Sequence, residues 1–150
     1  MIQRKQSVFL LLAFIASVVC LCLRIGDIEP AGMGVGFKLY NLMLDKGASV
    51  DYSPCGLFGI LLISSAMSLA TIFLYCNRKL QSSLCLCNVF LLLAWYIVLG
   101  VVTRNVVSAD ANFHIAFAAC LPAVSLVLNF MARAGVIHDE KMVRAADRIR

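Results

Sequence analysis

Charged residues are scarce in this chain, and four long stretches lack them altogether. Only 14% of the 150 residues are charged and 62% are hydrophobic, whereas soluble domains are roughly 25% charged and roughly 45–50% apolar. Residues 8–23, 57–76, 84–102 and 115–132 contain no Asp, Glu, Lys, Arg or His. Because a spanning helix needs roughly 20 mainly apolar residues, the sequence predicts an all-α integral membrane protein, with these four transmembrane helices in a single domain.

The lack of ionisable side chains inside the predicted spans also bears on function. Such groups within a membrane usually mark ion or proton pathways, so the spans give no support to that class of transporter. Histidine is limited to His114 and His138, which fall on opposite sides of the predicted membrane, so no zinc site and no cofactor are expected. Asp110 and His114 share a face if their segment is helical, but neither a nucleophile nor a metal partner lies nearby. We therefore expect no enzyme and no catalytic residue.

Cysteine, by contrast, is plentiful, and six of the seven cysteines lie in or at the ends of apolar runs. Cys20 and Cys22 are two residues apart, as are Cys85 and Cys87. Because alternate residues on a helix point about 200° apart, neither pair can chelate a metal through its own two sulfurs. We interpret these cysteines as small buried hydrophobic residues.

The positions of the positive charges predict an orientation. The second and third spans are joined by a short polar link, residues 77–83, which contains Arg78 and Lys79. Short loops that are rich in Lys and Arg stay in the cytoplasm, so the link and both chain ends are predicted to be cytoplasmic. Most of the thirteen basic residues then lie on that side. The net charge of +5 therefore reflects topology, and we do not expect nucleic-acid binding.

Residues 24–56 form the longest segment outside the spans, and we expect a small periplasmic cap between the first two helices. The segment is rich in glycine and proline, which favour turns. Residues 37–44 are apolar enough to rest at the membrane surface, and either a short strand pair or an interfacial helix fits them. Tyr40 and Tyr52 suit the headgroup level, where amphipathic aromatic side chains collect.

Small residues recur along the second and fourth spans. Small residues four apart let helices approach closely in lipid, which makes this pattern typical of helix packing. The fourth span also contains Pro122, which should kink it, and Asn129, which lies at the right depth for a hydrogen bond to Asn88 of the third span. The candidate helix-packing residues are Gly59, Ser64, Ser68, Ala119 and Ala123.

Residues 133–150 are predicted to be a cytoplasmic tail with a short amphipathic helix. Its acidic residues precede most of its basic ones, which suits the helix macrodipole. Glu140 and Arg144 are four apart, a spacing at which opposite charges stabilise a helix. The tail can bind the inner leaflet, where each basic residue near anionic lipid contributes about 1 kcal/mol, or a protein partner. The candidate binding residues are Lys141, Arg144, Arg148 and Arg150.

Three short segments together resemble a known family. They are Met-Ile-Gln-Arg at residues 1–4 with Gln6, Asn-Arg-Lys-Leu-Gln at 77–81, and Asp-Glu-Lys-Met-Val-Arg-Ala-Ala-Asp-Arg-Ile-Arg at 139–150. In these segments the chain resembles the short four-helix inner-membrane proteins of Bacteroidetes-type bacteria that are classed as a domain of unknown function. Lys5 departs from the apolar residue expected there, and the loop 24–56 contributes little. The resemblance implies a bacterial inner-membrane location and a four-helix fold, but no activity.

These observations leave three hypotheses for function. The first is an accessory or scaffold protein of the inner membrane, with membrane lipids and either a membrane-protein partner or further copies of itself as partners. The second is an oligomeric carrier or channel for a small neutral solute. The third is a membrane thiol or quinone redox protein, which rests on the cysteines alone.

Overall fold

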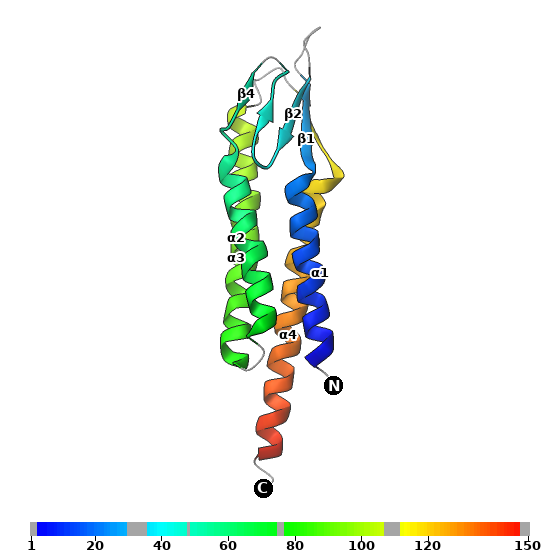
Figure 1. Cartoon of the computed structure of the whole chain (residues 1–150). Helices are drawn as coiled ribbons and strands as arrows, with labels where there is room; N and C mark the ends of the chain where they lie inside the picture. The colour runs from blue at the N-terminus through cyan, green and yellow to red at the C-terminus, as the bar shows by residue number, and fades with distance from the viewer. Residues whose placement is uncertain (1–2, 30–35, 48, 75–76, 107–111, 148–150) are drawn as a thin grey trace.

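Long helices run alternately towards and away from a small sheet that closes one end of the molecule (Figure 1). The computed structural model describes residues 3–29, 36–47, 49–74, 77–106 and 112–147. Within these ranges the helices are α1 (Gln3–Cys22), α2 (Cys55–Phe73), α3 (Arg78–Val106) and α4 (Leu121–Asp147). α1 and α3 each pack against both α2 and α4. α1 begins and α4 ends at the end opposite the sheet (Figure 1).

Among the described residues, three helical stretches are long and apolar enough to cross a membrane. They are Cys55–Phe73, Lys79–Val106 and Phe117–Val143. The apolar part of α1, Gln6–Cys22, is shorter. The four predicted helices are therefore all present, with three of them long enough by this measure to be spans. α3 has 29 residues, which at ~1.5 Å per residue makes it longer than the ~30 Å of membrane hydrocarbon.

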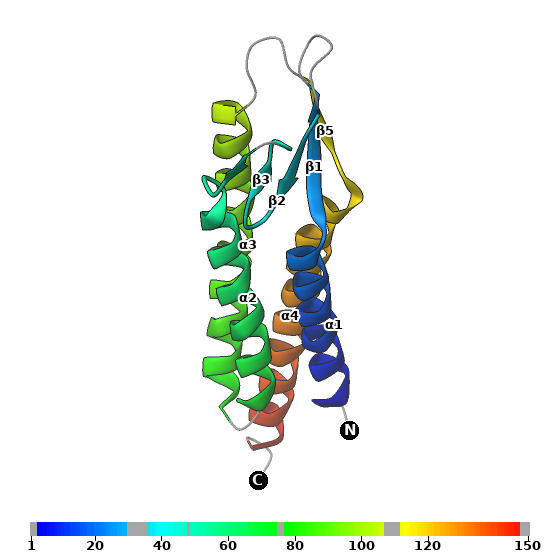
Figure 2. The ribbon, with the colours of Figure 1, turned by 45° about the horizontal axis from the view of Figure 1, so that its top comes forward.

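The prediction of an all-α protein is wrong, because five short strands form an antiparallel sheet in the order β4-β3-β2-β1-β5. The strands are β1 (Arg24–Glu29), β2 (Phe37–Tyr40), β3 (Leu44–Asp45), β4 (Val50–Asp51) and β5 (Asn112–Ile115). Four of these strands come from the predicted cap, residues 24–56. Of the two alternatives for residues 37–44, strands are therefore correct and an interfacial helix is wrong. The fifth comes from the connection between α3 and α4, and the whole sheet is seen in Figure 2.

One face of the sheet packs on the ends of the helices, and this contact joins the sheet to the helix bundle. Ile25 and Ile28 of β1, Leu39 of β2 and Leu44 of β3 are buried in one cluster with side chains from α2 and α3. The helical members include Leu57, Leu61, Leu92, Trp95 and Leu99. Burying these apolar surfaces together stabilises the contact. The cap and the bundle therefore share one hydrophobic core.

Two predicted helix boundaries need correction. α3 already begins at Arg78, so most of the predicted polar link forms the first turns of that helix. α4 begins at Leu121, after the 3-10 helix η1 (Phe117–Cys120), rather than near residue 115. Pro122 is thus in the first turn, where its missing N–H has no intrahelical partner to lose. Within α4 the proline therefore breaks no hydrogen bond of the helix, which is the cause expected for a kink.

The tail predicted from residue 133 is helical, but it is not a short helix of its own, because α4 continues without a break to Asp147. Val136, beyond the predicted end of the span, is still buried. The side chain of Gln6 near the start of α1 packs against Gly135 and donates a hydrogen bond to Asp139. These contacts hold residues 133–139 against α1 in helical form. The end of α4 projects beyond the other helices (Figure 1).

Candidate functional site

Asn88 lies at the centre of a buried polar cluster that joins three helices. The Oγ of Ser64 donates to the Oδ1 of Asn88 over 2.6 Å, and the Nδ2 of Asn88 donates to the Oγ of Ser68 over 2.7 Å. The same Nδ2 donates to the Oδ1 of Asn129 over 3.1 Å. All four side chains are buried. Because an unpaired amide in an apolar interior is costly, this cluster fixes α2 and α4 against α3.

A second buried contact joins α1 to α4. The hydroxyl oxygens of Ser17 and Ser125 are 3.0 Å apart, and each hydroxyl also lies within hydrogen-bond distance of the carbonyl oxygen of Ala13. The Nδ2 of Asn129 donates to the carbonyl oxygen of Ser125 over 2.8 Å. The two contacts are therefore continuous along α4, and together they link all four helices through polar groups inside the bundle.

A third buried contact ties the cap to the bundle through Asn41. Its Nδ2 donates to the carbonyl oxygen of Cys20 over 2.6 Å, and its Oδ1 accepts from the Nε1 of Trp95 over 3.2 Å. Asn41 and Trp95 are fully buried. One side chain from the turn after β2 thus holds the end of α1 and the half of α3 nearer the sheet.

The structure separates the candidate helix-packing residues into two groups. Ser64 and Ser68 lie in the Asn88 cluster, and Ala119 is buried, with its carbonyl oxygen accepting a hydrogen bond from Tyr96 over 2.8 Å. Ala123 is exposed. A Cβ on Gly59 would meet no atom within 4 Å, so no described neighbour requires a glycine there.

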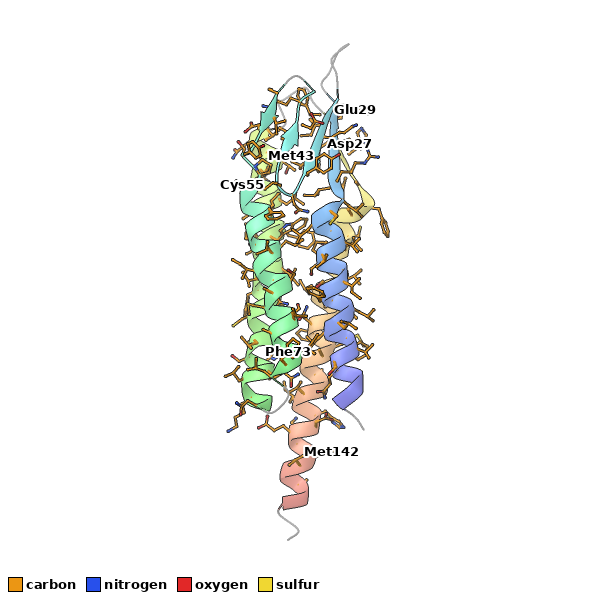
Figure 3. All side chains as sticks on the ribbon, in the orientation of Figure 1. Asp27, Glu29, Met43, Cys55, Phe73 and Met142 are labelled. Carbon is orange, nitrogen blue, oxygen red and sulfur yellow. The ribbon has the colours of Figure 1, made fainter. Side chains whose placement is uncertain are left out.

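The candidate tail residues all come from the projecting end of α4 or lie beyond it. Lys141 is exposed, and Arg144 is part of the helix. Arg148 and Arg150 lie outside the described residues. Two neighbouring apolar side chains, Met142 and Val143, are 52% and 45% exposed, and Figure 3 shows Met142 on the part of α4 beyond the other helices.

Each closely spaced cysteine pair has one buried and one exposed member. Cys20 and Cys85 are buried, whereas Cys22 and Cys87 are exposed, and all four are free thiols. This agrees with the opposite directions expected on a helix. No group of three or more His, Cys, Asp or Glu that could hold a metal occurs in the part of the chain described.

His114 is not on a helix, so the helical pairing with Asp110 does not apply. It lies in β5 opposite Asp27 of β1, and its Nε2 is 3.8 Å from a carboxylate oxygen of Glu29. Asp110 lies outside the described residues. Figure 3 shows Asp27 and Glu29 on β1, at the sheet end of the molecule.

A cavity of about 560 Å³ lies between the sheet and the last turns of α3. Its lining combines charged, polar and apolar side chains: Phe37, Lys46, Asp51, Ser53, Val102, Asn105 and Val106. The Nζ of Lys46 is 3.3 Å from the Oδ2 of Asp51. The hydrogen bond from the backbone N–H of Ser53, with smaller contributions from its side chain and from Lys46, lowers the pKa of Asp51 below its ordinary value. The cavity therefore presents an ammonium beside a carboxylate that stays ionised at neutral pH.

Sequence reasoning had singled out Asn88 and Asn129 but missed Ser17, Asn41, Ser125 and the cavity. Ser17 and Ser125 are isolated polar residues in apolar runs, a signal that was present in the sequence. Asn41 similarly interrupts the apolar stretch 37–44. The cavity had no such signal, because its lining comes from β2, the turn between β3 and β4, β4, the loop before α2 and the end of α3.

Long apolar helices joined inside by polar side chains define a multi-pass membrane protein. Within that class, residues 2–149 match the family described as Domain of unknown function (DUF4293). The chain therefore belongs to this family. A comparison with curated proteins found no match.

Proposed function

We propose that the protein is an accessory or scaffold protein of a bacterial inner membrane, without enzymatic activity of its own. In this proposal both termini are cytoplasmic, the sheet is periplasmic, and α1 serves as a fourth span. Membrane lipids and a membrane-protein partner, or further copies of the chain, are its partners, and nucleic acid is not. The distribution of basic residues supports this orientation.

The observation that carries the proposal is the projecting end of α4, residues 140–147, here called the arm. α4 remains helical to Asp147, and the arm exposes Lys141, Met142 and Val143. An ordered helix with exposed apolar side chains next to a cation offers a partner both hydrophobic area and charge. The arm is also held in a fixed direction by the contact of Gln6 with Asp139.

The internal hydrogen bonds support a scaffold as well. The Oδ1 of Asn88 accepts from Ser64, and its Nδ2 donates to both Ser68 and Asn129. Hydrogen bonds of this kind hold membrane helices together at about 0.6–2 kcal/mol each. These polar groups therefore satisfy one another's hydrogen-bonding capacity, as expected of side chains that pack helices together.

The test is purification of the full chain from native membranes in mild detergent, with the molecular mass and co-purifying proteins read together. We expect a stoichiometric partner or a defined homo-oligomer that is lost in the double variant Met142→Glu/Val143→Glu. The matched control is Val50→Glu, because Val50 is 49% exposed on β4 at the opposite end and should leave the complex intact. A lone monomer in the unaltered protein would contradict the proposal. A complex that survives the arm variant would contradict the role of the arm.

An oligomeric carrier or channel for a small neutral solute is the second candidate. It is favoured by the buried polar side chains that follow one another along the bundle, Ser17, Ser125, Asn129 and Asn88. Solute uptake by vesicles that contain the purified protein tests it, and flux no greater than in empty vesicles would reject it.

A further inference from the structure

The cavity beside the sheet combines opposite charges with an apolar wall. Lys46 and Asp51 supply the charges, while Phe37, Val102 and Val106 are partly buried and pack against the core. Asn105 and Ser53 add further polar groups. Its volume, about 560 Å³, falls within the roughly 300–1,000 Å³ of small-ligand sites.

The cavity also lies at a particular depth. Val102 ends the uncharged run 84–102, and Val106 lies in the last turn of α3, beyond Arg104. Since α3 is longer than the hydrocarbon layer is thick, its last turns reach the headgroup region at the sheet end. The apolar wall of the cavity thus continues towards the acyl chains, and its charged groups lie at the level of lipid headgroups.

The ion pair in the cavity can accept a ligand at little cost. The side chains of Lys46 and Asp51 are 37% and 39% exposed, and exposed ion pairs contribute only about 0–1 kcal/mol to stability. An ammonium has three donors and an ionised carboxylate about four acceptor positions, so both retain capacity beyond their mutual contact. A lone anion would meet the carboxylate of Asp51, and a lone cation would meet Lys46. Charge complementarity therefore favours a ligand that carries both charges.

We propose that this cavity binds the phosphoethanolamine headgroup of a zwitterionic phospholipid in the leaflet at the sheet end. The ammonium of Lys46 contacts the phosphate, and the carboxylate of Asp51 accepts hydrogen bonds from the ethanolamine ammonium. Val102 and Val106 contact the start of the acyl chains. The site is separate from the arm and does not depend on the scaffold function.

The test is native mass spectrometry of the full-length protein after exchange into mixed micelles with equal amounts of phosphatidylethanolamine and phosphatidylglycerol. We expect retained phosphatidylethanolamine in preference to phosphatidylglycerol. Lys46→Gln and Asp51→Asn should each lower its retention by about tenfold, because each removes a charge-assisted hydrogen bond. Equal retention of both lipids, or unchanged retention in both variants, would overturn the proposal.

Two controls separate lipid binding from a purely structural role of the ion pair. The first control is Asp27→Asn, which breaks the ion pair of Arg24 with Asp27. The two charged groups of that pair are also 3.3 Å apart, but neither residue lines the cavity. Retention of phosphatidylethanolamine should therefore be unchanged. The charge-swapped variant Lys46→Asp/Asp51→Lys keeps an ion pair but reverses its direction relative to the membrane. Retention should remain low in it, and full recovery would show that only the pair itself matters.

A final competition experiment distinguishes the two sources of this headgroup, a phospholipid and free phosphoethanolamine. Soluble phosphoethanolamine should compete with phosphatidylethanolamine only at much higher concentration, because it lacks the acyl chains that contact α3. If soluble phosphoethanolamine competed at an equal concentration, the proposal that the ligand is a lipid would be overturned, and the ligand would be free phosphoethanolamine.

Discussion

The side-chain amide of Asn88 on α3 donates a hydrogen bond to the side-chain carbonyl of Asn129 on α4, 3.1 Å away. The two residues are 41 positions apart in the chain, and both are buried. Asn88 also pairs with Ser64 and Ser68 of α2. One residue therefore sets the depth at which three helices meet, since sliding any of them would leave buried polar groups unpaired.

Replacing Asn88 by Leu should destabilise the bundle. The variant leaves Ser64, Ser68 and Asn129 without this partner, at an expected cost of about 1–3 kcal/mol in the free energy of unfolding. Unfolding by sodium dodecyl sulfate in mixed micelles measures it. The control is Leu93→Ala, a change of an exposed side chain on the same helix, which should cost far less. Equal stabilities of Asn88→Leu and the unaltered protein would contradict a stabilising role for the cluster.

Replacing Asn41 by Leu should loosen the cap while leaving the helices formed. The variant removes both the hydrogen bond to the carbonyl of Cys20 and that from Trp95, and leaves these buried groups unsatisfied at about 1–3 kcal/mol each. Hydrogen exchange of the β2 and β3 amides should accelerate. Leu42→Ala, next to it but exposed, should leave exchange unchanged. Equal exchange in both variants would disprove the tie between cap and bundle.

Gly26 should not tolerate a larger residue. A Cβ at this position would lie 2.7 Å from the ring of Phe113 and 2.8 Å from the carbonyl oxygen of His114. Gly26→Ala must therefore push β5 away from β1, at an expected cost of about 1–3 kcal/mol. Thermal unfolding measures it against Gly36→Ala, whose Cβ would make an ordinary 3.7 Å contact. The close packing of β1 on β5 would be refuted by a fully stable Gly26→Ala protein.

The proposed orientation predicts which residues a membrane-impermeant thiol reagent reaches. In a protein with all native cysteines replaced, Ser49→Cys in the exposed loop between β3 and β4 should be labelled in intact spheroplasts. Ser83→Cys, exposed near the start of α3, should be labelled only after the membrane is opened. Because basic residues near helix ends stay in the cytoplasm, the reverse pattern would invert the topology.

The carboxyl of Asp51 should titrate below its ordinary value in the folded protein. Its pKa is lowered from 3.8, first by the hydrogen bond from the backbone N–H of Ser53 and to a smaller degree by Lys46. The resulting stabilisation is complete above the unfolded pKa and is lost as the pH falls through the lower folded pKa. Carboxyl NMR of the folded and unfolded chains measures both midpoints. Lys46→Gln should raise the folded midpoint only in part, and a folded midpoint at or above the unfolded one would contradict the prediction.

Sequence reasoning worked best where one segment carries its own signal. The apolar runs identified the helices because long uncharged stretches are typical of helices that lie in a membrane. The depth of Asn88 and Asn129 within their runs allowed a hydrogen bond between them, and the structure contains that bond. Helix ends were less accurate, as at Arg78 and Leu121, because tertiary contacts and the tolerance of Pro122 in a first turn shift them.

The sequence by itself determined that this is a membrane protein of several helices, because hydrophobic length is a local property of the chain. Only the tertiary structure decided the sheet, the cavity and the fixed direction of the end of α4. β1 pairs with β5 from a segment far along the chain, and the cavity lining spans residues 37–106. These features depend on contacts between segments that are far apart in the chain, and no single segment of the sequence predicts such contacts.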